Sequence, residues 1–505
     1  MHWNLTSPAD SRRYDPAQVF AAGMEQHAIA NTAYPIGHVT TMRPYRITRR
    51  QVQAFAPLPW EDISEMGLYV HIPFCEVRCG FCEYAVIDPK QNAAQKDDYF
   101  DLLLREFALW GQAIDSRHKT LTGFDIGGGT PSLPDASQIG RVMEAAARHF
   151  HLPADVTISI ETTPKIAAID AKKLVAYKAM GIRRISMGVQ TVSPCLLEAI
   201  GRTATTLEWN RQAVENIRAA GYDNFNVDVM YGFARQNVDS VEATLRHVIA
   251  LAPEHITLYQ MRYKGTRIAH QAAGITWAQI GEQAKLAKQM LAEAGYWAAP
   301  GKNTFSRIPG DLGTSDYLTN RVVYATPYLG IGLGAQSLSH TSLSYNSGAA
   351  DKEMRLYRRH VEADELPIQD IYHLSREAAM GKFVAVAFYF GGIHLPSFQA
   401  KFGCGLESAF PDAVHFVLER GLMAYDGETL QLTAAGVEAK PGVHALFYAP
   451  AVQEHLIKLC RGEQVRPRSG WRRVWQAEWA AVHQTSSVAV TNPLPRDMPP
   501  CAGRG

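Results

Sequence analysis

The sequence lacks the features that would place it in a membrane or outside the cell. It has no run of 18 or more apolar residues, so we expect no transmembrane helix. Residues 1–8 have neither the basic region nor the apolar run of a signal peptide. The seven cysteines are an odd number and three of them are clustered, which does not indicate a disulfide framework. We therefore expect a cytoplasmic protein.

The sequence also lacks an excess of charge of either sign. Its 50 Lys and Arg against 49 Asp and Glu leave a formal net charge of +1. Broad surfaces for nucleic acid or anionic lipid need a basic excess, so we expect no nucleic-acid partner. Basic residues gather only between Arg461 and Arg473, which we interpret as a solvated surface rather than a site for an anionic substrate.

Cysteine is concentrated at Cys75, Cys79 and Cys82, with the spacing C-x3-C-x2-C. Zinc would require a fourth ligand, and structural zinc sites usually combine two separated pairs. No second Cys or Cys/His pair lies nearby in the sequence, although His71 is a candidate fourth ligand. Three thiolates on a four-iron cluster would leave one iron open to another ligand. We favour the iron–sulfur cluster.

Strands and helices alternate six times after this point. The expected strands are residues 67–72, 122–126, 156–160, 184–187, 225–229 and 255–259, and the expected helices are residues 97–113, 135–150, 168–180, 207–220, 238–251 and 277–294. Regular alternation favours a parallel sheet curved into a barrel, in which chemistry collects at the carboxyl ends of strands. The predicted fold class is α/β, with a partial (β/α)6 TIM-like barrel.

The other regions divide the chain into four parts. Residues 1–66 are predicted to be an N-terminal arm that packs on the following domain and contains a helix at about 16–27. The barrel domain is predicted over residues 67–345. Residues 346–460 are predicted to form a mainly helical C-terminal domain with a wing-like hairpin at 422–432, around Asp426-Gly427. Residues 461–505 are predicted to be a basic, proline-rich tail with a helix near 471–483.

The cysteine segment resembles a known family. Cys75-x3-Cys79-x-Phe81-Cys82 resembles the signature of radical S-adenosylmethionine (SAM) enzymes. Tyr69-x-His71-Ile-Pro-Phe74-Cys75 is similar to the HemN-like group, which includes oxygen-independent coproporphyrinogen III oxidases and HemW heme chaperones. The resemblance spans residues 60 to 445. It implies that Cys75, Cys79 and Cys82 hold a [4Fe–4S] cluster whose fourth iron binds SAM, and that reduction then cleaves SAM to a 5′-deoxyadenosyl radical.

Further segments of the resemblance follow successive strands. They are Gly127-Gly-Gly-Thr130-Pro131, Ser159-Ile-Glu161-x-x-Pro164, Arg184-Ile-Ser-Met-Gly188-Val-Gln190, Gly201-Arg202-Thr203 and Asn226-Val-Asp228-Val-Met-Tyr231-Gly232. The cofactor-binding residues implied are Tyr69, Phe81, Gly128, Gly129, Thr130, Glu161, Gln190, Arg202 and Asp228. Taken alone, Glu161 is more typical of a solvated charge, and Asp228 fits a helix cap as well as a ligand contact. No residue is assigned a catalytic role.

One departure from the resemblance bears on the substrate. The oxidases carry a fourth cysteine two residues after the third, where this sequence has Tyr84. A tetrapyrrole such as coproporphyrinogen is the implied substrate, with a flavodoxin or ferredoxin as electron donor. Two alternatives stay open: a heme chaperone of the HemW type, with His71 as a candidate heme contact, and a radical C-methyltransferase that uses a second SAM.

Overall fold

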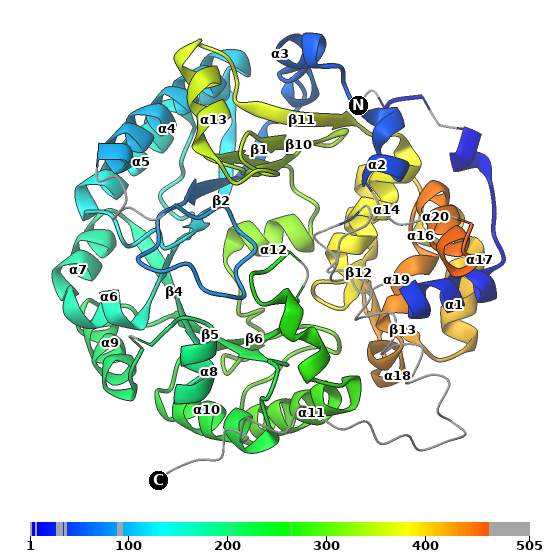
Figure 1. The fold of residues 1–505 in the computed structure, drawn as a ribbon. Coiled ribbons are helices and arrows are strands. Elements are labelled where there is room, and N and C mark those ends of the chain that lie inside the picture. Colours follow the sequence, from blue (N-terminus) through cyan, green and yellow to red (C-terminus); the bar gives the residue numbers. More distant parts are fainter. Residues whose placement is uncertain are drawn as a thin grey trace.

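A large, mostly parallel sheet forms the centre of the molecule (Figure 1). The computed structural model describes residues 3–5, 8–26, 34, 38–87, 94–203, 205–263 and 265–463. Within these ranges the strand order is β11-β10-β9-β8-β1-β2-β3-β4-β5-β6-β7. The first six strands are β1 (Glu65–Ile72), β2 (Thr120–Gly128), β3 (Ile158–Thr162), β4 (Ile182–Gln190), β5 (Phe225–Tyr231) and β6 (His255–Gln260), and they pair in parallel. This is the predicted partial (β/α)6 barrel.

Helices cover the outer face of these strands (Figure 1). They are α4 (Ala94–Ala113), α5 (Ala136–His149), α6 (Pro164–Ile169), α7 (Ala171–Ala179), α8 (Pro194–Ala199), α9 (Leu207–Ala219), α10 (Val238–Ala250) and α11 (Trp277–Glu293). The helix predicted at 168–180 is present as α7, and the short helix α6 before it was not predicted. Asp170 separates them because its side chain accepts a hydrogen bond from the Lys173 backbone and so caps α7.

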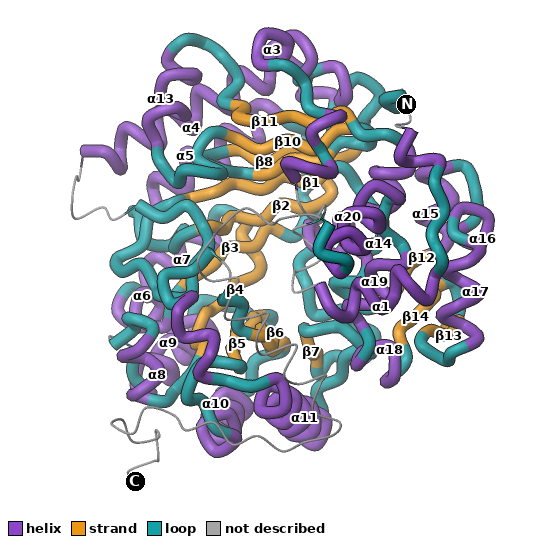
Figure 2. The backbone as a smooth tube through the Cα atoms, turned by 45° about the vertical axis from the view of Figure 1, so that its right-hand side comes forward, coloured by secondary structure: helices purple, strands orange, loops and turns teal. Residues whose placement is uncertain are grey.

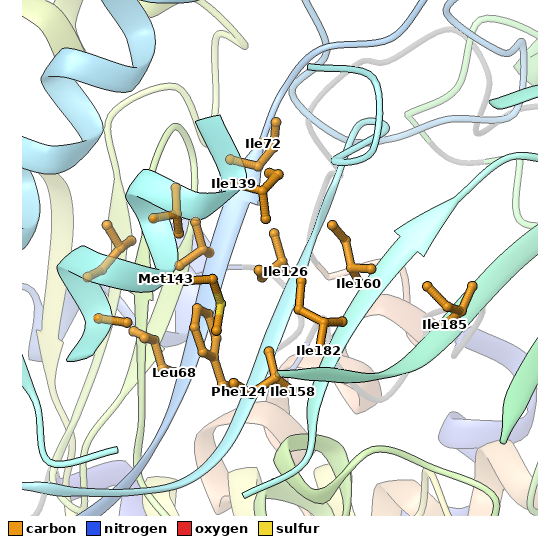
Figure 3. Packing of buried hydrophobic residues seen from close by; sticks show 14 of the residues in the cluster. Leu68, Ile72, Phe124, Ile126, Ile139, Met143, Ile158, Ile160, Ile182 and Ile185 are labelled. Carbon is orange, nitrogen blue, oxygen red and sulfur yellow. The ribbon is translucent and has the colours of Figure 1, made fainter. Parts of the chain in front are cut away.

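The main hydrophobic core lies between this helical layer and the sheet. In Figure 3, Ile139 and Met143 of α5 project toward Phe124 and Ile126 of β2. All four side chains are buried. Burying one such side chain stabilises the fold by about 1.5–3 kcal/mol. Outward-facing strand residues therefore supply the stability, which leaves the inner surface of the barrel available for polar residues.

The sheet continues past the barrel strands, which the sequence does not predict. The added strands are β7 (Thr304–Ser306), β8 (Tyr328–Ile331), β9 (Gln336–Leu338), β10 (Ser342–Asn346) and β11 (Ile368–His373). The glycine-rich stretch 328–336 provides β8, which pairs in parallel with β1. Gly330 is needed there because a Cβ would lie 2.3 Å from the Gln336 carbonyl oxygen. The region 346–460, predicted to be mainly helical, therefore also contributes the strand β11 to the main sheet. The division of the chain into domains stays a prediction.

The C-terminal helices form a second body with its own core (Figure 2). They are α14 (Arg376–Ala387), α15 (Leu395–Phe402), α16 (Leu406–Ala409), α17 (Pro411–Glu419), α18 (Ala434–Glu438), α19 (Lys440–Leu446) and α20 (Pro450–Cys460), whereas α13 (Met354–Glu362) packs on α4 and shares the main core. The predicted hairpin is present as β13 (Met423–Asp426) and β14 (Thr429–Leu432), joined by β12 (Gly392–His394). The tail helix predicted near 471–483 lies outside the described residues.

The N-terminal arm packs on two bodies. Its helices are α1 (Pro16–Gln26), α2 (His38–Thr41) and α3 (Val52–Phe55). The predicted helix α1 packs on α19 and α20 rather than on the barrel. Tyr45 donates a hydrogen bond to Asp10, which also accepts one from Ser375 of the C-terminal body. The end of the arm packs on the barrel, as predicted for the whole arm. There the Lys119 ammonium donates hydrogen bonds to the Trp60 and Ile63 carbonyls.

None of the helices among the described residues combines the length and apolar character needed to cross a bilayer.

The helix α12 (Asp316–Val322) packs against the amino-terminal halves of β1 and β2. A Cβ on Gly123 of β2 would lie 2.2 Å from the Tyr317 backbone nitrogen, so the glycine leaves room for this helix. This helix therefore closes the end of the barrel opposite the carboxyl ends of the strands.

One buried carboxyl group ties α4 to the added strands. Glu106 is fully buried and accepts hydrogen bonds from the Gly332 backbone (2.9 Å), the Asn346 amide (2.7 Å) and the Tyr357 hydroxyl (2.5 Å). Burial raises the pKa of Glu106 to about 7, although the three donors act to lower it. The three hydrogen-bond donors therefore stabilise the ionised form of the Glu106 carboxyl group against its burial.

We expect Tyr357→Phe to lower the free energy of unfolding by about 1.5–3 kcal/mol, because it removes one donor to a buried, charged acceptor. Urea unfolding measures the change. The matched control is Tyr425→Phe, whose hydroxyl contacts Glu407 at an exposed position, and there the change should stay within about 0.5 kcal/mol. Equal effects of the two substitutions would contradict the role given to Glu106.

Candidate functional site

The three cysteines lie on a loop that leaves the carboxyl end of β1. The loop is pinned at both sides: the Ile87 amide donates to the Pro73 carbonyl (2.7 Å), and the Cys75 amide donates to the Ile87 carbonyl (3.2 Å). Cys75, Cys79 and Cys82 are all half-buried and carry free thiols. Among the described residues, no three His, Cys, Asp or Glu side chains are grouped tightly enough to bind a single metal ion.

Burial disfavours the thiolate form of two cysteines of this loop, Cys75 and Cys82. Burial raises the pKa of Cys75 to about 12, while the Thr130 hydroxyl at 3.2 Å acts in the opposite direction. Burial also raises the pKa of Cys82. The neighbouring thiols contribute to both shifts, so the three sulfur atoms lie within electrostatic range of one another. A positive metal centre would be needed to release these protons.

His71 holds this loop rather than adding a ligand to it. It is buried, its Nε2 lies 3.0 Å from the Ala85 carbonyl oxygen, and its Nδ1 lies 3.4 Å from the Tyr69 hydroxyl. Burial lowers its pKa to about 4, so the ring is neutral and its Nε2 donates to Ala85. Both ring nitrogens of His71, the candidate zinc ligand and heme contact, are thus engaged within the protein.

The glycine loop after β2 lies directly against the cysteine loop. The Gly129 amide donates to the Ile72 carbonyl (2.8 Å), and the Thr130 amide donates to the Phe74 carbonyl (2.7 Å). A Cβ on Gly129 would lie 2.8 Å from the Phe74 carbonyl oxygen, and Gly128 has a φ of 118°. Only glycine allows this approach and this conformation. The predicted residues Gly128, Gly129 and Thr130 are therefore adjacent to the three cysteines.

The predicted residues of β4 and the following turn also meet. The Arg202 guanidinium donates to the Gly188 carbonyl (2.8 Å), and a Cβ on Gly188 would lie 2.8 Å from the Gln190 amide nitrogen. Gln190 has a φ of 69°, which is uncommon for a residue other than glycine. Its Oε1 is buried and has no hydrogen-bond partner in the structure. This acceptor is one that a bound ligand could satisfy.

Three carboxyl groups face one another inside the barrel. The Glu161 side chain is accessible from the barrel interior, yet partial desolvation there and the charges of Asp228 and Asp125 raise its pKa to about 8. Desolvation likewise raises the pKa values of Asp228 and Asp125 to about 6. Arg184, a buried guanidinium on β4, opposes these shifts. Asp228 is held by the Asn226 amide at 2.7 Å, and Asp125 by the Ser315 hydroxyl at 2.6 Å. The predicted contacts Glu161 and Asp228 thus share one environment.

Tyr69 and Phe81 occupy different positions. Tyr69 is inside the barrel: its ring lies 3.0 Å from a Cβ position on Gly127 and stacks on Tyr317 with centroids 6.0 Å apart. Phe81 packs on Phe233 at 6.2 Å, in a small apolar cluster beside the cysteine loop. Tyr69 therefore joins the group around Glu161, whereas the ring of Phe81 supports the loop.

Other residues of the interior were not predicted as site residues. Tyr84 is 60% exposed and Tyr259 is 37% exposed, yet each is electrostatically coupled to the other and to Tyr389. Tyr259 is an inward position near the end of β6, which strand alternation could have indicated. Tyr389 follows α14, and no sequence pattern places that segment over the barrel. Tyr84, noted in the sequence only as a missing cysteine, faces the same space as Glu161.

Comparison with known proteins agrees with this geometry. Residues 69–248 match the Radical SAM superfamily. The heme chaperone HemW of Buchnera aphidicola is 35% identical over 199 residues, which cover 39% of this chain and 51% of that protein. The oxygen-independent coproporphyrinogen III oxidase of Salmonella typhimurium is 32% identical over 220 residues, covering 44% and 46%. The chain thus spans about half the length of these curated relatives.

A solved structure matches over a longer range. The coproporphyrinogen III oxidase (HemN) of Escherichia coli superposes with a TM-score of 0.67 at 23% identity, over 82% of this chain and 96% of that one. At this identity the match establishes the fold. It includes both the barrel and most of the remaining chain, and so confirms the predicted fold class.

A barrel with a three-cysteine loop against a glycine loop is the arrangement of a radical SAM domain, and residues 69–248, which form most of this barrel, match that superfamily. The relatives that resemble it are named HemW and coproporphyrinogen III oxidase (HemN), as the sequence resemblance implied. The predicted cofactors, a [4Fe–4S] cluster and SAM, are those of this class. The relatives named HemW and HemN differ in function, so the group does not by itself select a reaction.

The residues present fit these cofactors. Cys75, Cys79 and Cys82 offer three soft ligands without a fourth, as a cluster with an open iron requires. The glycine loop beside them allows a ligand to approach its backbone, and Gln190 offers an unsatisfied buried acceptor. Metal and ligand can therefore occupy adjacent positions at the carboxyl ends of β1 to β5.

The acid cluster predicts a pH dependence of stability in the cofactor-free protein. The pKa of Glu161 is raised from 4.5 to about 8 by folding, so the folded state binds more protons and its stability falls as the pH rises through this window. Glu161→Gln removes this penalty. Its melting temperature should exceed that of the wild type at about pH 9, with a difference that shrinks towards about pH 5.

Thermal unfolding at a series of pH values measures this difference. Glu144→Gln, an exposed substitution on α5, is the matched control and should follow the wild type at each pH. A Glu161→Gln variant whose difference from the wild type does not grow with pH would show that the carboxylate is not destabilised in the barrel.

Proposed function

We propose that the protein is a radical SAM enzyme that acts on a tetrapyrrole-type substrate. The contact between the cysteine loop and the glycine loop carries this proposal, because it sets three free thiols beside a backbone that a ligand can approach. Cys75, Cys79 and Cys82 would hold the cluster. When bound and reduced, the cluster and SAM supply a 5′-deoxyadenosyl radical that removes hydrogen from the substrate.

The chain's own residues would bind and orient SAM. Gly128, Gly129 and Thr130 would receive its amino end next to the cluster. Glu161 and Asp228 lie further inside the barrel and, with Arg202 and Gln190, offer hydrogen bonds to its ribose and adenine edges. Tyr69, behind Gly127, would limit how deeply the ligand enters. All these positions lie at or near the carboxyl ends of the parallel strands, where such barrels collect their chemistry.

The substrate would lie between the barrel mouth and the C-terminal body. Tyr389 follows α14 of that body and interacts electrostatically with Tyr259 of β6. Tyr84 faces the same space from the cysteine loop. Three tyrosines give this space flat apolar faces with polar tips, which suits a planar, polar-edged ring system. The tetrapyrrole substrates of relatives support the same substrate class.

We also propose an electron-donating partner and a cellular location for the protein. A flavodoxin or ferredoxin would supply the electron, since the chain needs a one-electron reductant to start the reaction. A net charge of +1 gives no support to a nucleic-acid partner. The free cysteine loop requires a reducing compartment, which supports a cytoplasmic location.

The test is anaerobic reconstitution of the full chain followed by reduction. We expect about four iron atoms per chain and release of 5′-deoxyadenosine from SAM. Cys79→Ala should lower this release by about a hundredfold or more, whereas Cys404→Ala, a free cysteine in the C-terminal body, should retain it. A reconstituted wild-type protein that never cleaves SAM would overturn the proposal.

Product analysis with coproporphyrinogen present then defines the reaction. Decarboxylated tetrapyrrole would identify an oxidase, and S-adenosylhomocysteine beside 5′-deoxyadenosine would identify a methyltransferase. Tyr84 in place of the oxidases' fourth cysteine bears directly on this choice, because it presents a phenol rather than a thiol to the space that it shares with Glu161.

A heme chaperone is the second candidate, and the 35% identity to HemW favours it. It predicts stoichiometric heme binding without turnover, measured by titration in the Soret region. Because both nitrogens of His71 are engaged, we expect His71→Gln to weaken the cysteine loop and iron incorporation more than heme affinity. A wild-type protein whose Soret spectrum does not change on titration would exclude this candidate.

A further inference from the structure

An ion pair at the mouth of the barrel joins the segment after β6 to the cysteine loop. Arg262 comes just after β6 and donates through Nη2 to Glu83 Oε2 at 3.3 Å. The backbone fixes this arrangement, because the Arg267 amide donates to the Gly80 carbonyl at 3.0 Å. The Arg262 guanidinium therefore lies at the carboxyl end of a parallel strand, beside the loop that carries the three cysteines.

The contact with Glu83 uses only part of the Arg262 guanidinium. The Arg262 side chain is 44% exposed, and among the described residues its hydrogen bond to Glu83 is the only one that it makes. A guanidinium carries five N–H donors in a planar fork, so most of them remain available to a ligand. Exposed ion pairs contribute little to stability, and Lys352 also lies within electrostatic range of Glu83. Glu83 therefore keeps a neighbouring cation when Arg262 turns to a ligand.

The Arg262 guanidinium borders the space that the tyrosines of the mouth share. Tyr84 follows Glu83 in the sequence, and its side chain is 60% exposed. Glu161 of β3 and Arg262 both act electrostatically on the Tyr84 hydroxyl group. Tyr389, in the segment after α14, acts on the same hydroxyl group from the second body. A cation thus lies at the rim of a space with aromatic walls.

We propose that Arg262 binds a carboxylate of the substrate and that Glu83 is the internal counter-ion which this carboxylate replaces. The inference rests on the proposed function, and it adds an acidic group at the edge of the planar substrate. Arginine suits this task because its planar fork can donate to both oxygens of one carboxylate. The rings of Tyr84, Tyr259 and Tyr389 would contact the face of the ring system while Arg262 fixes its edge.

The first measurement is porphyrin binding to the reconstituted full chain without reductant, so that no turnover occurs. Coproporphyrin III is an acidic tetrapyrrole, and its tetramethyl ester is the uncharged comparison. Arg262→Met should weaken binding of the acid by about tenfold or more and leave the ester unchanged, because a charge-assisted hydrogen bond is lost. Arg262→Lys keeps the charge without the fork and should retain part of the affinity. The matched control is Arg211→Met, whose ion pair with Glu208 on α9 also measures 3.3 Å, and it should alter neither affinity.

The second measurement removes the counter-ion. Glu83→Gln should strengthen binding of coproporphyrin III by about two- to fivefold, because the Glu83 carboxylate no longer competes for Arg262. Glu208→Gln, in the matched ion pair on α9, should leave the affinity at the wild-type value. A gain in affinity does not arise from a misfolded chain, so this variant tests the proposal even if Arg262→Met is unstable.

Three results would overturn the proposal. One is a wild-type chain that binds the acid no more tightly than its ester. Another is binding of the acid that Arg262→Met leaves unchanged or that Glu83→Gln does not strengthen. The third is a loss of affinity for SAM rather than for coproporphyrin III in Arg262→Met, which would assign Arg262 to the carboxylate of SAM. The titration measures porphyrin binding whether or not the sample cleaves SAM, so failure of the proposed function and failure of this inference are separate observations.

Discussion

The site depends on the close backbone contact between the loops that follow β1 and β2. Because the two strands are parallel neighbours, their carboxyl ends emerge side by side. Gly129 and Thr130 then donate to the carbonyls of Ile72 and Phe74, and no side chain larger than that of glycine fits at residue 129. The cysteine loop is thus held by backbone groups, while its thiols remain free to bind. His71 secures the far end of the same loop through the Ala85 carbonyl.

The polar interior of the barrel is the second constraint. Arg184 is buried beside the carboxyl groups of Asp125, Glu161 and Asp228, and Arg321 and Arg202 also act on Asp125 and Asp228, respectively. These cations do not offset the desolvation of the three carboxyl groups, so the pKa of each rises. The fold tolerates this because its stability comes from the apolar layer outside the strands (Figure 3). A ligand with hydroxyl donors and a positive charge, such as SAM, would satisfy the interior better than water does.

The sequence predicts the parts of the molecule that are governed by local pattern. All six barrel strands, the glycine loop and the hairpin around Asp426-Gly427 follow from alternation and turn residues, and the observed bounds differ by a few residues. The strands β7 to β11 were not predicted: β7 and β9 have only three residues each, and none of the five strands belongs to a repeating strand–helix unit that a local pattern would reveal. Tyr389 was missed for a similar reason: its role arises from where α14 ends relative to β6, and local sequence does not encode that distance.

The C-terminal body bears most directly on the substrate. The barrel residues that match the family account for the cofactors, and they are compatible with either relative named above. Tyr389 comes from a segment beyond the superfamily match at 69–248, and it interacts electrostatically with Tyr84 of the cysteine loop and Tyr259 of β6. The residues that distinguish one member of the superfamily from another would therefore lie where the second body meets the barrel, and Tyr84 is the barrel residue placed to act with Tyr389.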